Sequence, residues 1–114
     1  GKPFVTHNIF FDVNSDVIRP NSYAVLKEVA QTLSGLKKPV QIIGHTDSDG
    51  NDANNLTLSQ KRAASVKRAL VNEFGLPENL LSSSGKGESQ PLNKNATPAQ
   101  KAQNRRVEFR LQDQ

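Results

Sequence analysis

Hydrophobic positions along the chain alternate between strand-like and helix-like spacing, and their order predicts the fold. Short runs with apolar weight occur at residues 5–12, 40–43 and 80–84, and apolar residues alternate with charged ones at 107–111; these four segments are predicted strands. The apolar residues of 22–33 and 59–73 follow helical spacing instead. We therefore predict an α/β (α+β) two-layer sandwich of order βαβαββ, with two helices packed on one face of a mixed four-stranded sheet.

Polar and turn-forming residues mark the connections between these elements. The run 46–55 is predicted to be a loop, and Ser59 is predicted to cap the second helix, because a serine hydroxyl can accept a hydrogen bond from a free backbone N–H. Glycine, proline and asparagine recur over residues 85–98, which are predicted to be a long connection that starts with a turn at 85–87.

Length and composition restrict the classes of function. A chain of 114 residues has the size of one domain, so residues 1–114 are predicted to be a single unit. The absence of cysteine excludes disulfides and thiolate metal sites. The absence of methionine indicates a piece of a longer protein; any export signal or membrane anchor would lie outside it, because no apolar run approaches the ~18 residues of a membrane span. The net charge of +4 is modest and its basic residues are scattered, so nucleic-acid binding is not predicted.

The polar segment after the second predicted strand carries the strongest candidate chemistry. Asp47 follows that strand closely, at a position where α/β sheets commonly place binding groups. Arg62 is predicted in the first helical turn, where a cation opposes the helix dipole unless it binds an anion. Such a pair suits a small zwitterion. The alternatives are a turn-forming carboxylate for Asp47 and a surface ion pair for Arg62.

Metal-binding and catalytic interpretations find less support. If Asp47 is taken as the first position of a calcium loop, Asp52 stands where glycine is required and Leu58 where glutamate is required. The only histidines are His7 and His45, and no serine lies in a nucleophile-elbow sequence. We therefore predict no metal site, no cofactor and no catalytic residue, while a pair of carboxylates that cleaves glycosidic bonds stays open as an alternative.

Four short motifs occur along the chain: Phe-Asp at 11–12, Gly-His-Thr-Asp at 44–47, Leu-Ser-x-x-Arg at 58–62 and Asn-Arg-Arg at 104–106. In this order and at this spacing they resemble the OmpA-like C-terminal domain, a peptidoglycan-associating module of Gram-negative cell envelopes. The chain departs from the usual family pattern at Gln100 and Lys101, where the family has Gly-Arg. The departure retains a positive charge but loses the glycine.

The resemblance implies a non-enzymatic periplasmic anchor that binds peptidoglycan and belongs to a membrane-tethered parent protein. In this family the matching aspartate and arginine, here Asp47 and Arg62, hold the ammonium and carboxylate of the meso-diaminopimelate side chain. Residues implied to line the same crevice are Phe11, Asp12, Thr46, Asn55, Leu58, Asn104 and Arg105. The alternatives are the cell-wall anchor of a flagellar stator or secretion system and, from another class, a peptidoglycan-cleaving enzyme. The oligomeric state stays open, a homo-oligomer included.

Overall fold

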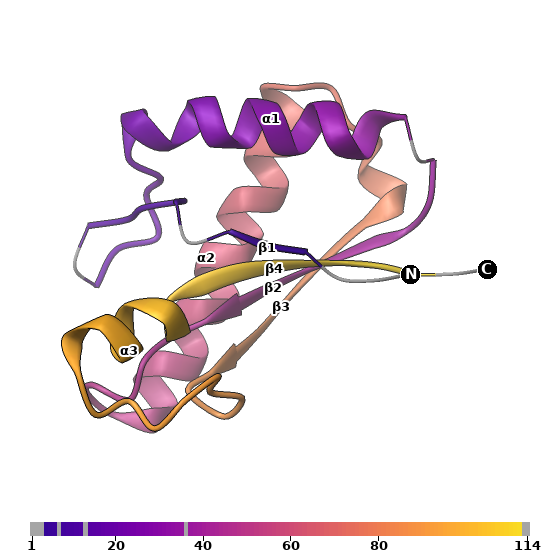
Figure 1. The fold of residues 1–114 in the computed structure, drawn as a ribbon. Helices are drawn as coiled ribbons and strands as arrows, with labels where there is room; N and C mark the ends of the chain where they lie inside the picture. The colour runs from indigo at the N-terminus through magenta and orange to yellow at the C-terminus, as the bar shows by residue number, and fades with distance from the viewer. Residues whose placement is uncertain (1–3, 7, 13, 36, 113–114) are drawn as a thin grey trace.

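Four strands form one mixed sheet, and two long helices cover one of its faces (Figure 1). The computed structural model describes residues 4–6, 8–12, 14–35 and 37–112. The elements in chain order are β1 (Phe4–Thr6), α1 (Tyr23–Ser34), β2 (Val40–His45), α2 (Asp52–Asn72), β3 (Leu81–Gly87), α3 (Pro98–Asn104) and β4 (Arg106–Leu111). The strand order is β1-β4-β2-β3, in which β4 is antiparallel to both neighbours and β2 is parallel to β3. The predicted fold class is confirmed.

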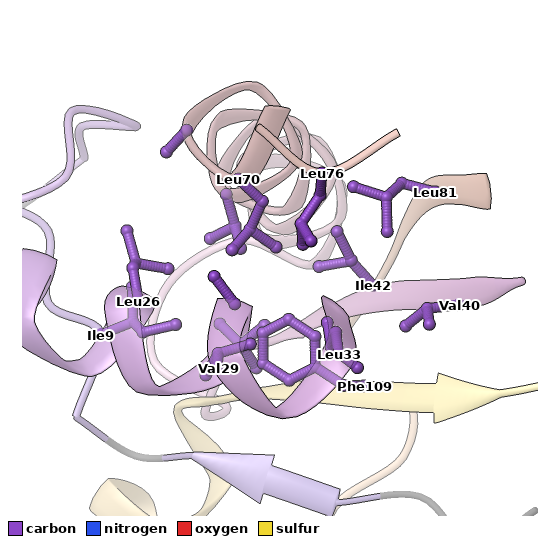
Figure 2. Close-up of a cluster of buried hydrophobic side chains, with 14 of the residues drawn as sticks. Ile9, Leu26, Val29, Leu33, Val40, Ile42, Leu70, Leu76, Leu81 and Phe109 are labelled. Atoms are coloured by element: carbon purple, nitrogen blue, oxygen red, sulfur yellow. The ribbon is translucent and has the colours of Figure 1, made fainter. Parts of the chain in front are cut away.

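The hydrophobic core lies between the helices and the sheet (Figure 2). The buried face of α1 repeats at helical spacing through Leu26, Val29, Ala30 and Leu33. These side chains meet residues of α2 and of the two central strands, among which Phe109 is fully buried. Burying one such side chain stabilises a fold by about 1.5–3 kcal/mol. The core therefore makes α2 and the two central strands a firm base for the loops at their ends.

The first strand is shorter than predicted. Only Phe4–Thr6 pairs with β4; residue 7 of the predicted strand 5–12 lies outside the described part, and residues 8–12 make only one isolated bridge, from Phe11 to Ile18. The reason is local hydrogen bonding. The N–H of Phe10 donates to Oγ of Ser22 at 2.7 Å, and its carbonyl accepts from the N–H of Arg19 at 2.9 Å. These bonds turn the segment toward α1 instead of along the sheet.

The second helix begins seven residues before the predicted cap. Its cap is Asn51, whose Oδ1 accepts hydrogen bonds from the N–H groups of Ala53 and Asn54 at 2.9 and 3.2 Å. The prediction of a loop over 46–55 is therefore wrong from Asp52 onward. The predicted place of Arg62 in the first helical turn is also wrong: Arg62 lies in the third turn of α2, where the helix dipole does not oppose a cation, so the dipole gives no reason to expect a bound anion there.

Ser59 joins α2 to the sheet rather than capping the helix. Its Oγ accepts a hydrogen bond from the N–H of Gly87 at 2.9 Å and donates to the carbonyl of Leu56 at 2.8 Å. The helix backbone lies so close to the strands that a Cβ atom on Gly44 would lie 2.4 Å from the carbonyl oxygen of Ser59, and one on Gly85 would lie 2.3 Å from its Oγ. The turn predicted at 85–87 is wrong, because these residues form the end of β3 and pack against α2.

A third helix, α3, begins where the predicted connection over 85–98 ends and occupies residues for which no element was predicted. Thr97 caps it with a reciprocal pair of bonds: Oγ1 of Thr97 accepts from the N–H of Gln100 at 3.1 Å, and Oε1 of Gln100 accepts from the N–H of Thr97 at 3.3 Å. Pro98 occupies the first helical position, where its missing N–H is harmless. The sequence contained this capping signal, but the helix is too short for hydrophobic periodicity to reveal it. Its position beside the end of β2 brings it to the candidate site.

Candidate functional site

A cavity of about 420 Å³ opens where β2 ends and β4 begins. Its lining comes from residues 8–11, the two strand ends, the middle of α2 and the C-terminal end of α3. Phe11, Arg62 and Arg105 belong to this lining, so three of the nine residues predicted to contact a ligand share one cavity. The lining also contains Arg106 but no carboxylate, which makes the cavity cationic.

The side chain of Arg62 is held in place by the chain segment that follows Phe11. Its Nε donates to the carbonyl of Ser15 at 2.9 Å, and its Nη2 donates to the carbonyl of Asp12 at 3.1 Å. The guanidinium carbon lies 4.8 Å from the centroid of the Phe11 ring, a cation–π contact. Burial lowers the pKa of Arg62, while Asp16 and then Asp47 oppose that shift, and the group stays a cation. Nη1 makes no hydrogen bond to any described residue, so it can serve a ligand.

The carboxylate of Asp47 is buried and already paired. Its Oδ1 accepts from the N–H of Asp49 at 2.9 Å, and its Oδ2 forms an ion pair with Nη1 of Arg105. Only 7% of Asp47 is exposed, whereas the Arg105 side chain is 51% exposed. A buried carboxylate requires such a partner, because desolvation of an unpaired charge is costly. The turn-forming role that was the alternative for Asp47 is therefore present, and the second oxygen faces a cation at the cavity.

Two ion pairs connect α3 to the loop that follows β2. Arg105 contacts Asp47, and Nζ of Lys101 lies 2.9 Å from Oδ1 of Asp49. The amide of Asn55 on α2 donates to the carbonyl of Asp49 at 2.8 Å and, more weakly, to that of Asp47 at 3.5 Å. Lys101, one of the two residues that depart from the family pattern, thus uses its charge to hold the same loop. The loop is fixed from both sides by polar contacts.

The other predicted ligand-lining residues are distributed around this cavity. Asn55 and Leu58 line a separate cavity of about 540 Å³ on the neighbouring face of α2. Asp12 contributes its carbonyl to Arg62, while its exposed carboxylate lies 3.5 Å from Arg19. Thr46 is buried and donates its hydroxyl to the carbonyl of Asp47 at 2.9 Å.

Asn104 has a structural position. Its side chain is fully buried; its Oδ1 accepts from the N–H of Leu92, and its Nδ2 donates to Oδ1 of both Asn93 and Asn95 at 2.8 and 2.7 Å. All three hydrogen bonds of the Asn104 side chain thus go to the 92–95 segment. We therefore assign Asn104 to holding that segment beside α3, and not to the ligand.

His45, which is not among the residues predicted to contact a ligand, lies in the cavity lining. The imidazole is buried, and its Nε2 lies 3.1 Å from Oε1 of Glu108. Burial lowers the pKa of His45, the charge of Arg106 adds to that shift, and Glu108 opposes it. The histidine is therefore neutral at pH 7. The alternation of apolar and charged residues at 107–111 places Glu108 on the polar face of its strand, so the sequence pattern did not indicate this buried pair.

Two further observations describe the molecule around this site. Within the described ranges, no group of three or more His, Asp or Glu side chains could hold a metal ion. Among the described helices, none combines the length and the apolar character that crossing a membrane requires.

Comparisons with known proteins give a consistent picture. The model of the OmpA family matches residues 10–105. Outer membrane porin F of Pseudomonas fluorescens is 42% identical over 108 residues, which are 94% of this chain and 33% of the porin. The peptidoglycan-associated lipoprotein of Burkholderia pseudomallei has a solved structure that is 33% identical, with a TM-score of 0.78 over 91% of this chain and 88% of that one. The cell wall anchor of the T6SS from Pseudomonas aeruginosa is 27% identical, with a TM-score of 0.79 over 94% of this chain and 76% of that one. The chain spans between 30% and 53% of the length of four curated relatives that it matches, porin F of two Pseudomonas species among them.

Proposed function

The chain belongs to the OmpA family, and from that premise we propose that it is a non-catalytic domain that binds peptidoglycan through the meso-diaminopimelate residue of the stem peptide. It would anchor an outer-membrane protein or lipoprotein to the cell wall, on the periplasmic side of a Gram-negative envelope. The observation that carries the proposal is the juxtaposition of a buried carboxylate, Asp47, with two arginines, Arg62 and Arg105, that line one cavity. A cationic cavity with the carboxylate of Asp47 paired to one of its arginines matches a ligand that carries both charges.

The geometry refines how the two charges of the ligand are received. Arg62 already uses Nε and one N–H of Nη2 for the carbonyls of Ser15 and Asp12, so its remaining N–H groups receive the ligand carboxylate. Arg105 supplies the second cation for the same carboxylate. The ligand ammonium binds to Asp47 and replaces Arg105 as the partner of that carboxylate. Phe11 keeps the guanidinium of Arg62 in position throughout.

The expected affinity for one site is modest. Hydrogen bonds to charged groups contribute on the order of 1.5–3 kcal/mol each. Two or three of them, after the cost of immobilising the ligand, correspond to a dissociation constant in the micromolar-to-millimolar range. A weak single site is adequate for an anchor, because peptidoglycan repeats its ligand and a tethered domain rebinds.

The test uses purified sacculi and free meso-diaminopimelate. We expect Asp47→Asn and Arg62→Ala each to reduce the affinity at least tenfold. Each variant loses a charge-assisted contact of about 1.5–3 kcal/mol, and about 1.4 kcal/mol corresponds to a factor of ten. The matched control is Arg68→Ala, which removes an exposed arginine from the same helix outside the cavity. Lysine-type stems, which lack the second carboxylate, should also bind much more weakly. If both variants sediment with sacculi as the parent does, the proposal is wrong.

A related role is supported by one comparison. The cell wall anchor of the T6SS from Pseudomonas aeruginosa shares this fold over most of the chain. The same domain could therefore attach a secretion-system or stator protein to the wall, with the same ligand and the same residues. The parts of the protein beyond this chain would distinguish these roles. A peptidoglycan-cleaving activity would instead release soluble fragments from sacculi, and we expect none.

A further inference from the structure

The second cavity, of about 540 Å³, lies on the face of α2 next to the first. It is lined by Asn14, Asp16, Asn54, Asn55, Thr57, Leu58 and Lys61. The lining is dominated by amide and hydroxyl groups, with one aliphatic side chain, one carboxylate and one cation. The proposed function assigns no role to this cavity.

Several of its polar side chains are not used by the fold. Asn14, Asn54, Thr57 and Lys61 make no side-chain hydrogen bond or ion pair with another described residue. In the first cavity, by contrast, Arg62 and Arg105 are bonded to the protein itself. Lys61 thus presents an unpaired ammonium group at a cavity that also offers free amides.

The carboxylate in the lining does not neutralise Lys61. Oδ2 of Asp16 lies 4.0 Å from Nη2 of Arg68, and the charge of Asp16 also acts on Arg62. Asp16 therefore faces two arginines. An anion that approaches Lys61 meets a local excess of positive charge.

The two cavities lie on either side of the contact between Arg62 and Ser15. Arg62 lines the first cavity, and its Nε donates to the carbonyl of Ser15, whose neighbours Asn14 and Asp16 line the second. Because the two cavities are neighbours, successive residues of one bound peptide can occupy both.

Building on the proposed function, we propose that this second cavity binds the acidic residue that precedes diaminopimelate in the stem peptide, and that Lys61 receives its free carboxylate. That residue is a glutamate linked through its side chain, so its α-carboxylate remains unblocked. Asn14 and Asn54 can each donate and accept hydrogen bonds, as the flanking peptide groups require. A lysine suits a single exposed carboxylate because it acts as a point charge. No aromatic ring lines the cavity to stack on a sugar, which favours the peptide over the glycan.

The experiment compares three soluble probes by calorimetry or NMR titration at 0.15 M salt. They are free meso-diaminopimelate, the tripeptide L-Ala-γ-D-Glu-meso-diaminopimelate, and the same tripeptide with the glutamate α-carboxylate amidated. We expect the parent chain to bind the acidic tripeptide about two- to fivefold more tightly than the amidated one, the range of an exposed ion pair. Lys61→Gln should remove that difference and leave the affinity for free diaminopimelate unchanged, and Lys61→Arg should restore it.

The matched control is Lys67→Gln, which removes the same charge from the same helix at a residue that lines neither cavity. Equal affinity of the parent for the two tripeptides would overturn the inference, as would an equal loss of discrimination in Lys67→Gln, or discrimination that survives in Lys61→Gln. Any of these three outcomes leaves the proposed function intact, provided that the parent chain binds free diaminopimelate and that Arg62→Ala abolishes this binding. Failure of all three probes to bind would instead overturn the proposed function itself.

Discussion

The base of the molecule and its binding end are held together by different forces. At the base, α1, α2 and the central strands enclose a core of apolar side chains, and α2 contacts the strand backbones directly at Gly44 and Gly85. At the binding end, the 47–49 loop and α3 are joined by two ion pairs and by the amide of Asn55. Close packing tolerates little displacement, whereas these ion pairs each have one partner that is at least half exposed, and such a partner can move to a ligand. The comparison indicates a rigid support that carries a site whose polar contacts can rearrange around a ligand.

The largest expected effect comes from disturbing the base. Gly85→Ala would place a methyl group 2.3 Å from Oγ of Ser59 and 2.4 Å from the backbone N of Gln60, so either the helix or the strand must move. We expect a loss of about 3 kcal/mol in the free energy of unfolding, at the upper end for overpacking. Urea denaturation measures it. Gly35→Ala is the control, because nothing lies within 4 Å of its added methyl group. A stable Gly85→Ala variant would contradict the close packing of α2.

A smaller effect is expected from loosening α3 at the binding end. Thr97→Ala removes the side chain that caps this helix, which typically costs about 1 kcal/mol. Without the cap, the amide protons of α3 should exchange faster, while those of α2 should not change. Because α3 carries Lys101 and leads into Arg105, the affinity for sacculi should also fall moderately. Hydrogen exchange followed by mass spectrometry separates these responses. Equal loss of protection in α2 and α3 would mean that the two regions are not independent.

The smallest expected effect is a change in how stability depends on pH. It comes from His45, which lines the first cavity, and from its partner Glu108. The pKa of His45 is lower in the folded chain than its usual 6.5, so the unfolded chain binds more protons as the pH falls through and below 6.5. For Glu108, burial raises the pKa, but hydrogen bonds from Arg110 and His45 outweigh it and leave the pKa below 4.5. The stability from Glu108 is therefore present above pH 4.5 and lost as the pH falls further. Both groups make the fold less stable in acid.

His45→Gln separates the two contributions. Its melting temperature should change less than that of the parent between pH 7 and pH 5, while the loss below pH 4.5 should persist. His7 is common to both chains, so the comparison isolates the replacement of His45. Thermal melts at half-unit pH intervals provide the measurement. A parent and variant with parallel profiles from pH 7 to 5 would contradict the role given to His45.

The elements that sequence reasoning located well are those with a buried apolar face. The helix α1 and the strands β2 and β4 have such a face, and their residues repeat at the expected period. Apart from residues 8–12, which were predicted as strand, the segments it misplaced lack such a face. The first turns of α2 are polar, the only buried residue of α3 is Asn104, and the second half of β3 consists of serine, glycine and lysine. Side-chain caps determine where α2 and α3 begin, and backbone pairing with β2 determines where β3 ends. Hydrophobic periodicity reveals neither caps nor backbone pairing.

For the site, the sequence by itself determined the candidate groups, one aspartate after β2 and one arginine in α2, and the motifs that indicate the family. Only the tertiary structure decided what those groups contact. Arg105 reaches Asp47 across 58 residues of chain, and Arg62 binds carbonyls 50 and 47 residues away. Such contacts follow from how the sheet and the helices bring distant segments together, and no local pattern encodes them. The same packing placed Lys61 and Arg62, adjacent in the sequence, at two different cavities, because successive residues of a helix point in different directions.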